Sequence, residues 1–182
     1  SLKCVGNPLD EKEFYIEIVA PKFENVFGFK PNIKYFDKKT TFGFRIYSKS
    51  IIRFLTEIMN LPIGKKYDYL KIPSILSGIN LINFIRGVFD TDGCISFKKE
   101  TYPVISVSSK NRDFLIEISN ILKKLEFKFS KVYTYKVKDE RLKKGFSIIS
   151  RIELSGFQNL NNWIKTIKFY SPKHLAKIEK YY

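Results

Sequence analysis

The feature that most constrains the fold is an internal repeat, in which two parts of the chain share one pattern. Phe14–Ile18 reads Phe-Tyr-Ile-Glu-Ile and Phe114–Ile118 reads Phe-Leu-Ile-Glu-Ile, an offset of 114 − 14 = 100 residues. Arg45-Ile46 recurs as Arg151-Ile152, at an offset of 151 − 45 = 106 residues. Because a longer loop at 138–145 accounts for the difference between the two offsets, we interpret the chain as two copies of one folding unit.

The two copies are expected to contain the same elements in the same order. A helix begins the shared pattern in each copy, because polar residues suited to a helix start precede an apolar stripe in both. Each helix leads into two strands joined by a turn, and then into a second helix that Ser48 or Ser155 is expected to cap. The expected ranges are strands 32–36 and 42–47 and helix 50–59 in the first copy, and strands 131–136 and 147–153 and helices 157–167 and 172–181 in the second.

A further helix is predicted ahead of the second copy, where Ile85–Gly93 reads Ile-Arg-Gly-Val-Phe-Asp-Thr-Asp-Gly. A helix beginning near Leu81 buries apolar residues that recur at three- and four-residue spacing, namely Ile82, Ile85, Val88 and Phe89. Small residues recur every four positions along another face, namely Asn83, Gly87 and Thr91. Since such a face lets a second helix approach closely, we expect this helix to pack against another helix.

Two aspartates and a glycine end this helix. Gly93 is expected to stop it as a C-terminal glycine, which leaves Asp92 beside the last carbonyl groups. The negative end of the helix dipole favours a cation there, so Asp92 is a candidate ligand for a divalent metal ion. An ordinary Asp-Gly turn after a buried helix is the competing interpretation of the same residues.

The second copy is complete, because strands near 94–99 and 104–108 follow the helix at Ile85–Gly93. Subtracting 100 from this stretch gives a position before residue 1, so the first copy is expected to lack its opening helix and first strand. Cys4–Gly6 is then the end of its second strand. The expected fold class is α+β, a duplicated αββαββα unit with antiparallel sheets whose first repeat, 1–77, is truncated at its N-terminus and whose second repeat is 78–182.

Composition favours a globular chain that binds a polyanion. The 182 residues are 44% hydrophobic and 16% aromatic, which is ample for a packed core, and the formal net charge is +15. The basic residues are interleaved with Tyr and Phe along the whole length, as in a folded nucleic-acid-binding protein. A chain that is simply rich in lysine, with no nucleic-acid role, is the weaker alternative.

Cysteine content and hydropathy exclude several other classes. Cys4 and Cys94 are the only cysteines, so neither a disulfide framework nor a zinc site is supported, and a reducing cytoplasmic setting fits best. The longest apolar run, Ile79–Phe89, is polar in places and shorter than the roughly 20 residues that cross a bilayer. We therefore expect no membrane partner.

The chain resembles the LAGLIDADG homing endonucleases of the two-repeat kind found in archaeal introns and inteins. Ile85–Gly93 fits the nine-residue motif, with Arg86 in place of the alanine in the family name. The resemblance covers nearly the whole chain when the repeat, the Gly-Lys-Lys turn after Gly64 and the Ser-Pro-Lys turn after Ser171 are included.

This resemblance implies two motif helices packed at a pseudo-twofold axis, each delivering one acidic residue to a metal site, with the sheets forming a saddle in the DNA major groove. Asp92 stands where the family has its metal ligand, and the carbonyl of Thr91 assists. Asp90 is more like a structural residue. The family's basic residue, which orients water and phosphate, corresponds to Lys65, Lys66 or Lys173, for which an ordinary exposed lysine is the alternative.

Phosphodiester hydrolysis by hard cations held between carboxylates is Mg²⁺ chemistry, because the candidate ligands are oxygens. A complete site needs a second carboxylate, and this sequence contains one motif helix. A homodimer that packs two Ile85–Asp92 helices is one source of the second carboxylate. His174, the single histidine, is expected to be a phosphate or surface contact and not a base.

Double-stranded DNA is the expected partner, contacted through polar residues that alternate along the strands. The expected base-reading residues are Lys34, Arg45, Lys98, Lys136 and Arg151, of which Lys136 and Arg151 are expected to share a face with Thr134, Ser147 and Glu153. The loop lysines Lys38, Lys39, Lys143 and Lys144 are expected to hold phosphates. A merely solvated sheet face is the competing interpretation.

The function expected from the sequence is site-specific, Mg²⁺-dependent cleavage of double-stranded DNA, inactive or dimer-dependent in this form. A non-cleaving DNA- or RNA-binding relic on the same scaffold, such as a maturase-like or regulatory binder, is the alternative, because loss of the first acidic residue is what degeneration would produce.

Overall fold

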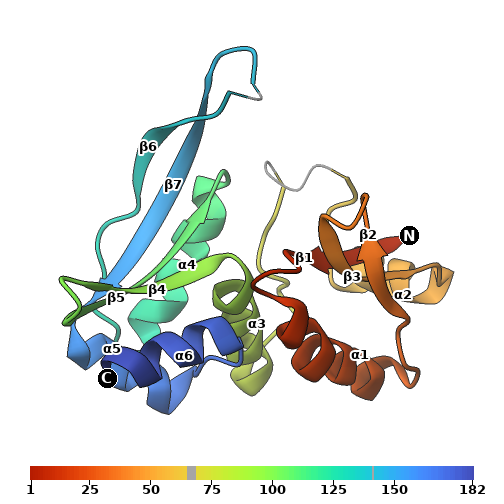
Figure 1. Cartoon of the computed structure of the whole chain (residues 1–182), viewed down its shortest axis with the longest axis horizontal. Coiled ribbons are helices and arrows are strands. Elements are labelled where there is room, and N and C mark those ends of the chain that lie inside the picture. The colour runs from red at the N-terminus through yellow and green to blue at the C-terminus, as the bar shows by residue number, and fades with distance from the viewer. Residues whose placement is uncertain (65–68, 141) are drawn as a thin grey trace. The chain divides into compact units, whose positions relative to one another are not determined.

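The structure is a computed structural model that describes residues 1–64, 69–140 and 142–182 (Figure 1). Its contacts divide it into two units, the first formed by Ser1–Ile58, Tyr170–Lys180 and Tyr182 and the second by Met59–Phe169 and Tyr181. Each unit contains one antiparallel sheet together with helices, so the predicted α+β class is confirmed. The division into repeats 1–77 and 78–182 stays a prediction.

The first unit has a three-stranded sheet in the order β1-β3-β2. Both strand pairs are antiparallel, with Lys3 opposite Arg45 and Lys34 opposite Gly43. The strands and helices of this unit are β1 (Leu2–Gly6), η1 (Phe14–Val19), α1 (Ala20–Phe27), β2 (Ile33–Phe36), β3 (Thr41–Ile46), α2 (Lys49–Arg53), η2 (Phe54–Ile58) and most of α6 (Pro172–Tyr181). The predicted hairpin is therefore present, and Ser48 caps α2 by accepting a hydrogen bond from the Ile51 N–H at 3.3 Å.

The first helix of this unit is not continuous α-helix. Its opening turns, η1, are π-helical, and the N–H of Ala20 donates to the carbonyl of Tyr15. Pro21 follows at the start of α1, where its ring has no N–H and is incompatible with the regular bond to the carbonyl four residues before it. The wider turns before the proline therefore have a local cause in the sequence.

The core of the first unit is aromatic. Its buried residues come from both the helices and the core face of the sheet, and Phe23 packs on Phe44 with 5.0 Å between ring centroids. The cluster consists of Tyr15, Phe23, Phe42, Phe44, Ile46 and Ile51. Since Phe42, Phe44 and Ile46 alternate along β3, the residues between them lie on the opposite face of this sheet.

The second unit has the order of elements expected for a complete copy. It contains α3 (Gly78–Thr91), β4 (Gly93–Lys98), β5 (Tyr102–Ser109), α4 (Arg112–Lys124), β6 (Tyr133–Lys138), β7 (Phe146–Ser155) and α5 (Phe157–Thr166). Its antiparallel sheet has the order β4-β5-β7-β6. The helix expected near Leu81 begins at Gly78.

The core of the second unit fixes α3 against the sheet and α5. Ile85 and Phe89 of α3 are fully buried, and the Phe89 ring lies 4.5 Å from the ring of Trp163, measured between centroids. Trp163 is the single tryptophan of the chain and is itself fully buried. The segment that leads into α3 is held on α4, where Asn111 Nδ2 donates to the Leu70 carbonyl at 2.9 Å.

Two expected helix ends are wrong. Ser155 does not cap α5, because Gly156 occupies the N-cap position with φ 91° and no side-chain cap bond is made. Gly93 is not in the left-handed region in which a C-terminal glycine stops a helix, and it begins β4 instead. A glycine is needed there for a different reason, since a Cβ would collide with the backbone of Phe89, whose Cα would lie 2.8 Å away.

Candidate nucleic-acid interface and acidic helix end

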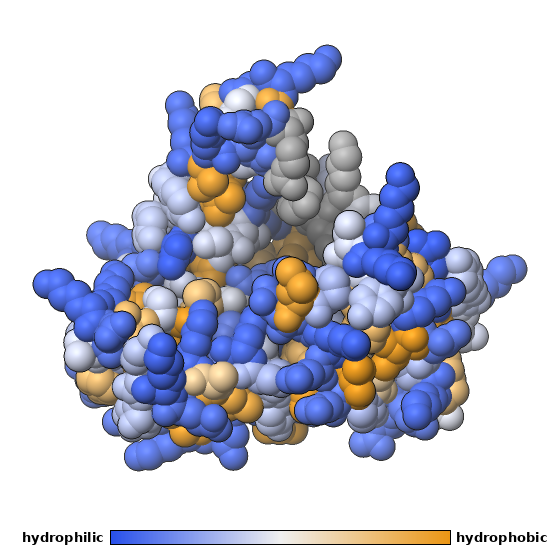
Figure 2. Space-filling model, in the orientation of Figure 1, coloured by the Kyte–Doolittle hydropathy of each residue, from blue (hydrophilic) through white to orange (hydrophobic). Residues whose placement is uncertain are grey.

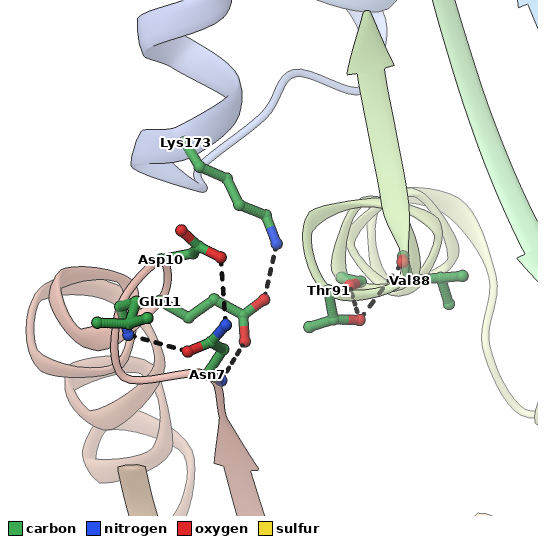
Figure 3. A network of polar contacts seen from close by, with 8 residues as sticks. Asn7, Asp10, Glu11, Val88, Thr91 and Lys173 are labelled. Carbon is green, nitrogen blue, oxygen red and sulfur yellow. Dashed lines mark hydrogen bonds and ion pairs between the residues drawn. The ribbon is translucent and has the colours of Figure 1, made fainter. Parts of the chain in front are cut away.

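The acidic end of α3 presents one carboxylate at the surface. Asp92 is the C-cap residue, is exposed, and its N–H donates to the Val88 carbonyl at 2.9 Å. Burial of Ile85 and Phe89 fixes the helix that carries it. Thr91 is also exposed, and its hydroxyl donates to the Gly87 carbonyl at 2.9 Å (Figure 3). The arrangement offers hard oxygen donors at the negative end of a helix dipole.

The other two polar residues of the motif are buried. Asp90 is 2% exposed, in keeping with the structural role expected for it. Arg86 is 7% exposed, and its Nε donates to the Ile167 carbonyl at 2.5 Å while its Nη1 donates to Asn83 Oδ1 at 2.7 Å. Because Ile167 is the C-cap of α5, Arg86 ties the motif helix to the end of α5. This explains an arginine at the position where the motif name has alanine.

The small-residue face of α3 is at the surface. Asn83, Gly87 and Thr91 are all exposed, and a Cβ added to Gly87 would meet no atom within 4 Å. The face is therefore open enough for the close helix approach expected from the sequence. That a second helix packs there stays a prediction.

The outer face of the first unit's sheet carries a cluster of cations around one aromatic ring. The Nζ atoms of Lys3 and Lys34 each lie 5.5 Å from the centroid of the Phe36 ring, and the guanidinium carbon of Arg45 lies 5.7 Å from it. Lys34 and Arg45 also line a hollow of about 510 Å³ together with Asn32, Tyr35, Phe36 and Tyr47. The structure thus brings together the two expected DNA-contacting residues of this sheet.

A carboxylate anchors the turn beside this cluster. Asp37 accepts hydrogen bonds from Lys3 Nζ at 2.6 Å and from the Thr41 hydroxyl at 2.8 Å. The hydrogen bond from Lys3, followed by that from Thr41, lowers the pKa of Asp37. Lys38 and Lys39 follow at the turn, both exposed and both with positive φ, at 55° and 68°. Their ammonium groups are carried on a turn fixed at its base.

The open face of the second unit's sheet holds an arginine in a fixed setting. Arg151 Nη2 donates to the hydroxyl of the buried Ser106 at 2.8 Å, and Arg151 Nε lies 3.0 Å from Glu153 Oε1. Burial lowers the pKa of Arg151, but a hydrogen bond with Tyr135 and the charge of Glu153 outweigh it, so the net pKa is raised. Burial, followed by the negative charge of Glu153, raises the pKa of Tyr133.

The expectation that Lys136 and Thr134 share this face is wrong. Tyr133 lies opposite Arg151 and Tyr135 opposite Ile149, so these tyrosines are on the face of Arg151. Lys136 lies opposite Ile148, one position out of phase, and therefore belongs to the other face. The ammonium of Lys136 is 4.8 Å from the centroid of the Phe146 ring.

The other lysines of the second unit that are expected to contact DNA are exposed at a strand end and in a loop. Lys98 ends β4, and Lys143 and Lys144 lie in the turn between β6 and β7. Lys144 lies 5.3 Å from the centroid of the Phe146 ring. Figure 2 shows mostly hydrophilic side chains at the far end of the β6–β7 hairpin.

Lys173 is held by a carboxylate that the sequence did not single out. Its Nζ lies 2.7 Å from Glu11 Oε1, and Glu11 Oε2 accepts the N–H of Asn7 at 2.9 Å (Figure 3). Gly6 makes room for this carboxylate, because a Cβ there would collide with the side chain of Glu11. The neighbouring His174 is 1% exposed, so the expected surface role of this histidine is wrong. Lys65 and Lys66 lie outside the described residues.

Several residues at these faces were missed from the sequence. Lys3, Phe36 and Glu11 were not candidate site residues, although period-two alternation in β1 and β2 places Lys3 and Phe36 on the face of Arg45. Tyr133 and Tyr135 lie in the strand expected at 131–136 but were not candidate site residues either. Among the described residues, no group of three or more His, Cys, Asp or Glu side chains is arranged to hold a metal ion. Within the same residues no helix is long and apolar enough to span a bilayer.

Comparison with known proteins gives three results. Residues 80–161 match the family model of the LAGLIDADG-like domain. A probable translation initiation factor IF-2 from Methanocaldococcus jannaschii is 30% identical over 141 residues, which are 74% of this chain. The chain spans only 12% of the length of that relative.

The fold is similar to that of I-DmoI in two crystal structures. One, of I-DmoI with DNA and Ca, has a TM-score of 0.55 and 16% identity, covering 96% of this chain and 80% of that one. The other, of an I-DmoI variant with its nicked target DNA in the presence of Mn, has a TM-score of 0.54 and 15% identity, covering 90% and 76%. The resemblance noted from the sequence is confirmed by both comparisons: residues 80–161 are similar to the LAGLIDADG-like domain, and the chain shares the fold of I-DmoI.

Proposed function

We propose that this chain binds double-stranded DNA and is the DNA-cleaving domain of a homing endonuclease. The observation that carries the proposal is the LAGLIDADG-like domain at residues 80–161, which contains Asp92 at an exposed helix end. Two open sheet faces bearing Arg45 and Arg151 support DNA as the partner. The net charge of +15 agrees with a polyanion ligand.

The end of α3 fits a divalent metal ion. The Asp92 carboxylate and the Thr91 carbonyl are oxygen donors, which suit Mg²⁺ better than metals that prefer nitrogen or sulfur. Bound there, the ion would lower the charge on a scissile phosphate and activate a water. Asp92 supplies one carboxylate, and buried Phe89 keeps the helix end in place for it.

The acidic site is proposed to need a second motif helix. Within residues 1–182, one stretch fits the motif, Ile85–Gly93, and its single carboxylate does not complete a two-carboxylate site. A second copy of this chain that packs on Asn83, Gly87 and Thr91 is one source of the partner carboxylate. The openness of that face supports such packing.

Three lysines have a proposed role in orienting phosphate and water, namely Lys65, Lys66 and Lys173. Lys173 is the candidate that can be examined, since Lys65 and Lys66 lie outside the described residues. Its ammonium is paired with Glu11 at 2.7 Å. A lysine already neutralised by a carboxylate favours the competing function, DNA binding without cleavage, because its charge is not available to a phosphate.

The setting of the chain is proposed to be an intein. The relative from Methanocaldococcus jannaschii bears the name of a translation factor, and the chain spans 12% of its length. A nuclease-like domain inside a much longer polypeptide of another function is what an insertion at the protein level leaves. An intron-encoded protein would leave no such segment in its host.

The test begins with a plasmid library that carries random duplex inserts, incubated with the chain and Mg²⁺. We expect cleavage at a selected sequence, and loss of that cleavage in Asp92→Asn. Asp113→Asn is the matched control, because Asp113 is exposed at the start of α4 and its loss changes the charge equally. Cleavage that survives in Asp92→Asn contradicts the role of Asp92.

The non-cleaving binder is supported instead if the wild-type chain binds DNA but cleaves none of it at any Mg²⁺ concentration or protein concentration.

The homodimer is tested separately by sedimentation, with Gly87→Leu as the variant. A side chain of that size on the small face blocks close helix approach. A wild-type chain that sediments as a monomer on its cleaved target contradicts the dimer.

A further inference from the structure

Two arginines that correspond in the internal repeat are held in different ways. Arg45 and Arg151 each begin an Arg-Ile pair. Each lies in a strand with a neighbour on both sides, since β3 lies between β1 and β2, and β7 lies between β5 and β6. Lys3 lies opposite Arg45, and Ser108 lies opposite Arg151. The residue two positions on is Tyr47 after Arg45, but Glu153 after Arg151.

The electrostatic settings of the two arginines are opposite. Arg45 lies among cations, because Lys3 and Lys34 approach the same Phe36 ring, and its hydrogen bond goes to the Tyr47 hydroxyl at 3.4 Å. Asp37 pairs with Lys3 at 2.6 Å, so that Lys34 and Arg45 are the cations of this cluster for which the described part of the chain shows no ion pair. Arg151 is instead paired with Glu153, so its charge is locally balanced. A balanced pair attracts phosphate weakly, whereas a cluster of cations attracts it strongly.

We propose that Arg151 and Glu153 together read one G·C base pair in the major groove, while Arg45 contacts a phosphate. This inference rests on the DNA binding proposed above. An arginine donates to guanine O6 and N7, and a glutamate accepts from the N4 amino group of cytosine, so the two side chains match the two bases of a single pair. Their own contact does not need to break when they bind.

The donor count of Arg151 agrees with this role. A guanidinium has five N–H groups. Ser106 and Tyr135 take one each, and Nε faces Glu153, so two of the five N–H groups are left for a base. The side chains of Arg151 and Glu153 are 30% and 21% exposed, which leaves part of each pair member accessible to a ligand.

The surroundings hold the pair in one orientation before any ligand arrives. Ser106 is 3% exposed and is fixed within β5, and the Tyr133 hydroxyl is hydrogen-bonded to Glu153. The rings of Tyr133 and Tyr135 lie 5.7 Å apart by their centroids and flank the pair. Ordering the long side chains beforehand lowers the entropy cost of binding, which favours specific readout over loose attraction.

The experiment selects binding sites from a randomised duplex DNA library and measures affinity over a range of salt concentrations. We expect the wild-type chain to enrich a sequence with an invariant G·C pair. The double variant Arg151→Gln with Glu153→Gln should lose preference for that pair by about ten-fold or more, since a good bidentate contact contributes that much discrimination. Its salt dependence should match the wild type, because the pair is removed without a change of net charge.

Arg45→Gln is the matched control, since it removes the corresponding arginine from the first unit. It should keep the enriched sequence and reduce the slope of log K against log salt by about 0.9, the value for one phosphate contact. Arg151→Lys is a second variant that keeps the charge and the fold, and it should relax the preference without changing the slope. Trp163 fluorescence checks folding of the Arg151 variants, because this single tryptophan is buried in the same unit, and thermal unfolding followed by circular dichroism checks Arg45→Gln.

An unchanged preference at every position in both Arg151 variants overturns the inference and leaves the proposed DNA binding intact. A smaller salt slope in Arg151→Gln with Glu153→Gln, equal to that of Arg45→Gln, also overturns it, because Arg151 would then be a phosphate contact. The inference is also overturned if the wild type binds DNA but enriches no sequence. A wild-type chain that does not bind duplex DNA overturns the proposed function as well.

Discussion

Replacement of Arg86 by methionine tests how the motif helix is held. Methionine keeps much of the stem volume but removes the hydrogen bonds of the guanidinium to the Ile167 carbonyl and to Asn83. The Ile167 carbonyl then loses its donor, and because Ile167 is fully buried, water does not replace that donor. An unsatisfied buried acceptor costs about 1–3 kcal/mol. The bond to Asn83 counts for less, since Asn83 is exposed and water takes the place of Arg86 there.

One effect opposes this loss. A guanidinium that is 7% exposed carries a desolvation cost, and methionine relieves it. The end of α5 favours a cation, however, because its last carbonyls carry partial negative charge. We expect the acceptor loss to outweigh the relief, so that Arg86→Met lowers the free energy of unfolding by about 1–2 kcal/mol.

The assay is equilibrium unfolding in urea, followed by Trp163 fluorescence. Trp163 reports on this region because its ring lies against Phe89 of α3. With a typical urea slope of about 1–2 kcal/mol/M, the midpoint should fall by about 1 M. Arg112→Met is the matched control, since Arg112 is exposed at the start of α4 and should change stability by less than about 0.5 kcal/mol. An Arg86→Met protein as stable as the wild type refutes the reasoning.

Three further predictions concern stability and pH. Gly93→Ala should destabilise the second unit by more than about 2 kcal/mol in the same assay, because the new Cβ collides with the Phe89 backbone. A decrease in the free energy of unfolding of less than about 0.5 kcal/mol argues against that collision. The pKa of Tyr133 is raised, so the stability that this residue confers is present below the ordinary pKa of 10.0 and is lost as the pH rises through the folded-state pKa. Tyr133→Phe should therefore reduce the decrease of the unfolding midpoint at alkaline pH, and an unchanged decrease counts against the prediction. The pKa of Asp37 is lowered, so its contribution is present above the ordinary value of 3.8 and is lost as the pH falls through the folded-state value. If this anchor holds the turn, the protection factor of the Thr40 N–H, which corrects its exchange rate for the intrinsic effect of pH, should fall at acid pH in the wild type and at neutral pH in Asp37→Asn.

Local patterns in the sequence were enough to predict most of the elements. The repeat and the alternation of apolar residues gave both hairpins, and the four-residue spacing gave α3 with Ile85 and Phe89 in the core. Asn111 and Ser48 sit at helix starts and accept backbone N–H groups there, as short polar residues do. These features depend on residues within one turn or one hairpin of each other.

Features that depend on distant residues could not be predicted. Lys136 was assigned to the face of Arg151, but the phase of β6 on β7 is set by the geometry of the turn at 139–145, which composition does not specify. The ion pair of Lys173 with Glu11 joins residues 162 positions apart, and no local pattern marks it. The hydrogen bond from Arg86 to the Ile167 carbonyl likewise joins residues 81 positions apart, so the motif alone does not predict it.

The unequal settings of Arg45 and Arg151 have a consequence for how such a protein evolves. A symmetric homodimer presents the same groups twice, so every substitution changes both halves of a palindromic site together. A duplicated chain is free of this coupling, and here one repeat has Tyr47 where the other has Glu153. In the proposed DNA-binding function, the residues around Arg45 and those around Arg151 can thus change independently of each other, one substitution at a time, within each copy of the chain.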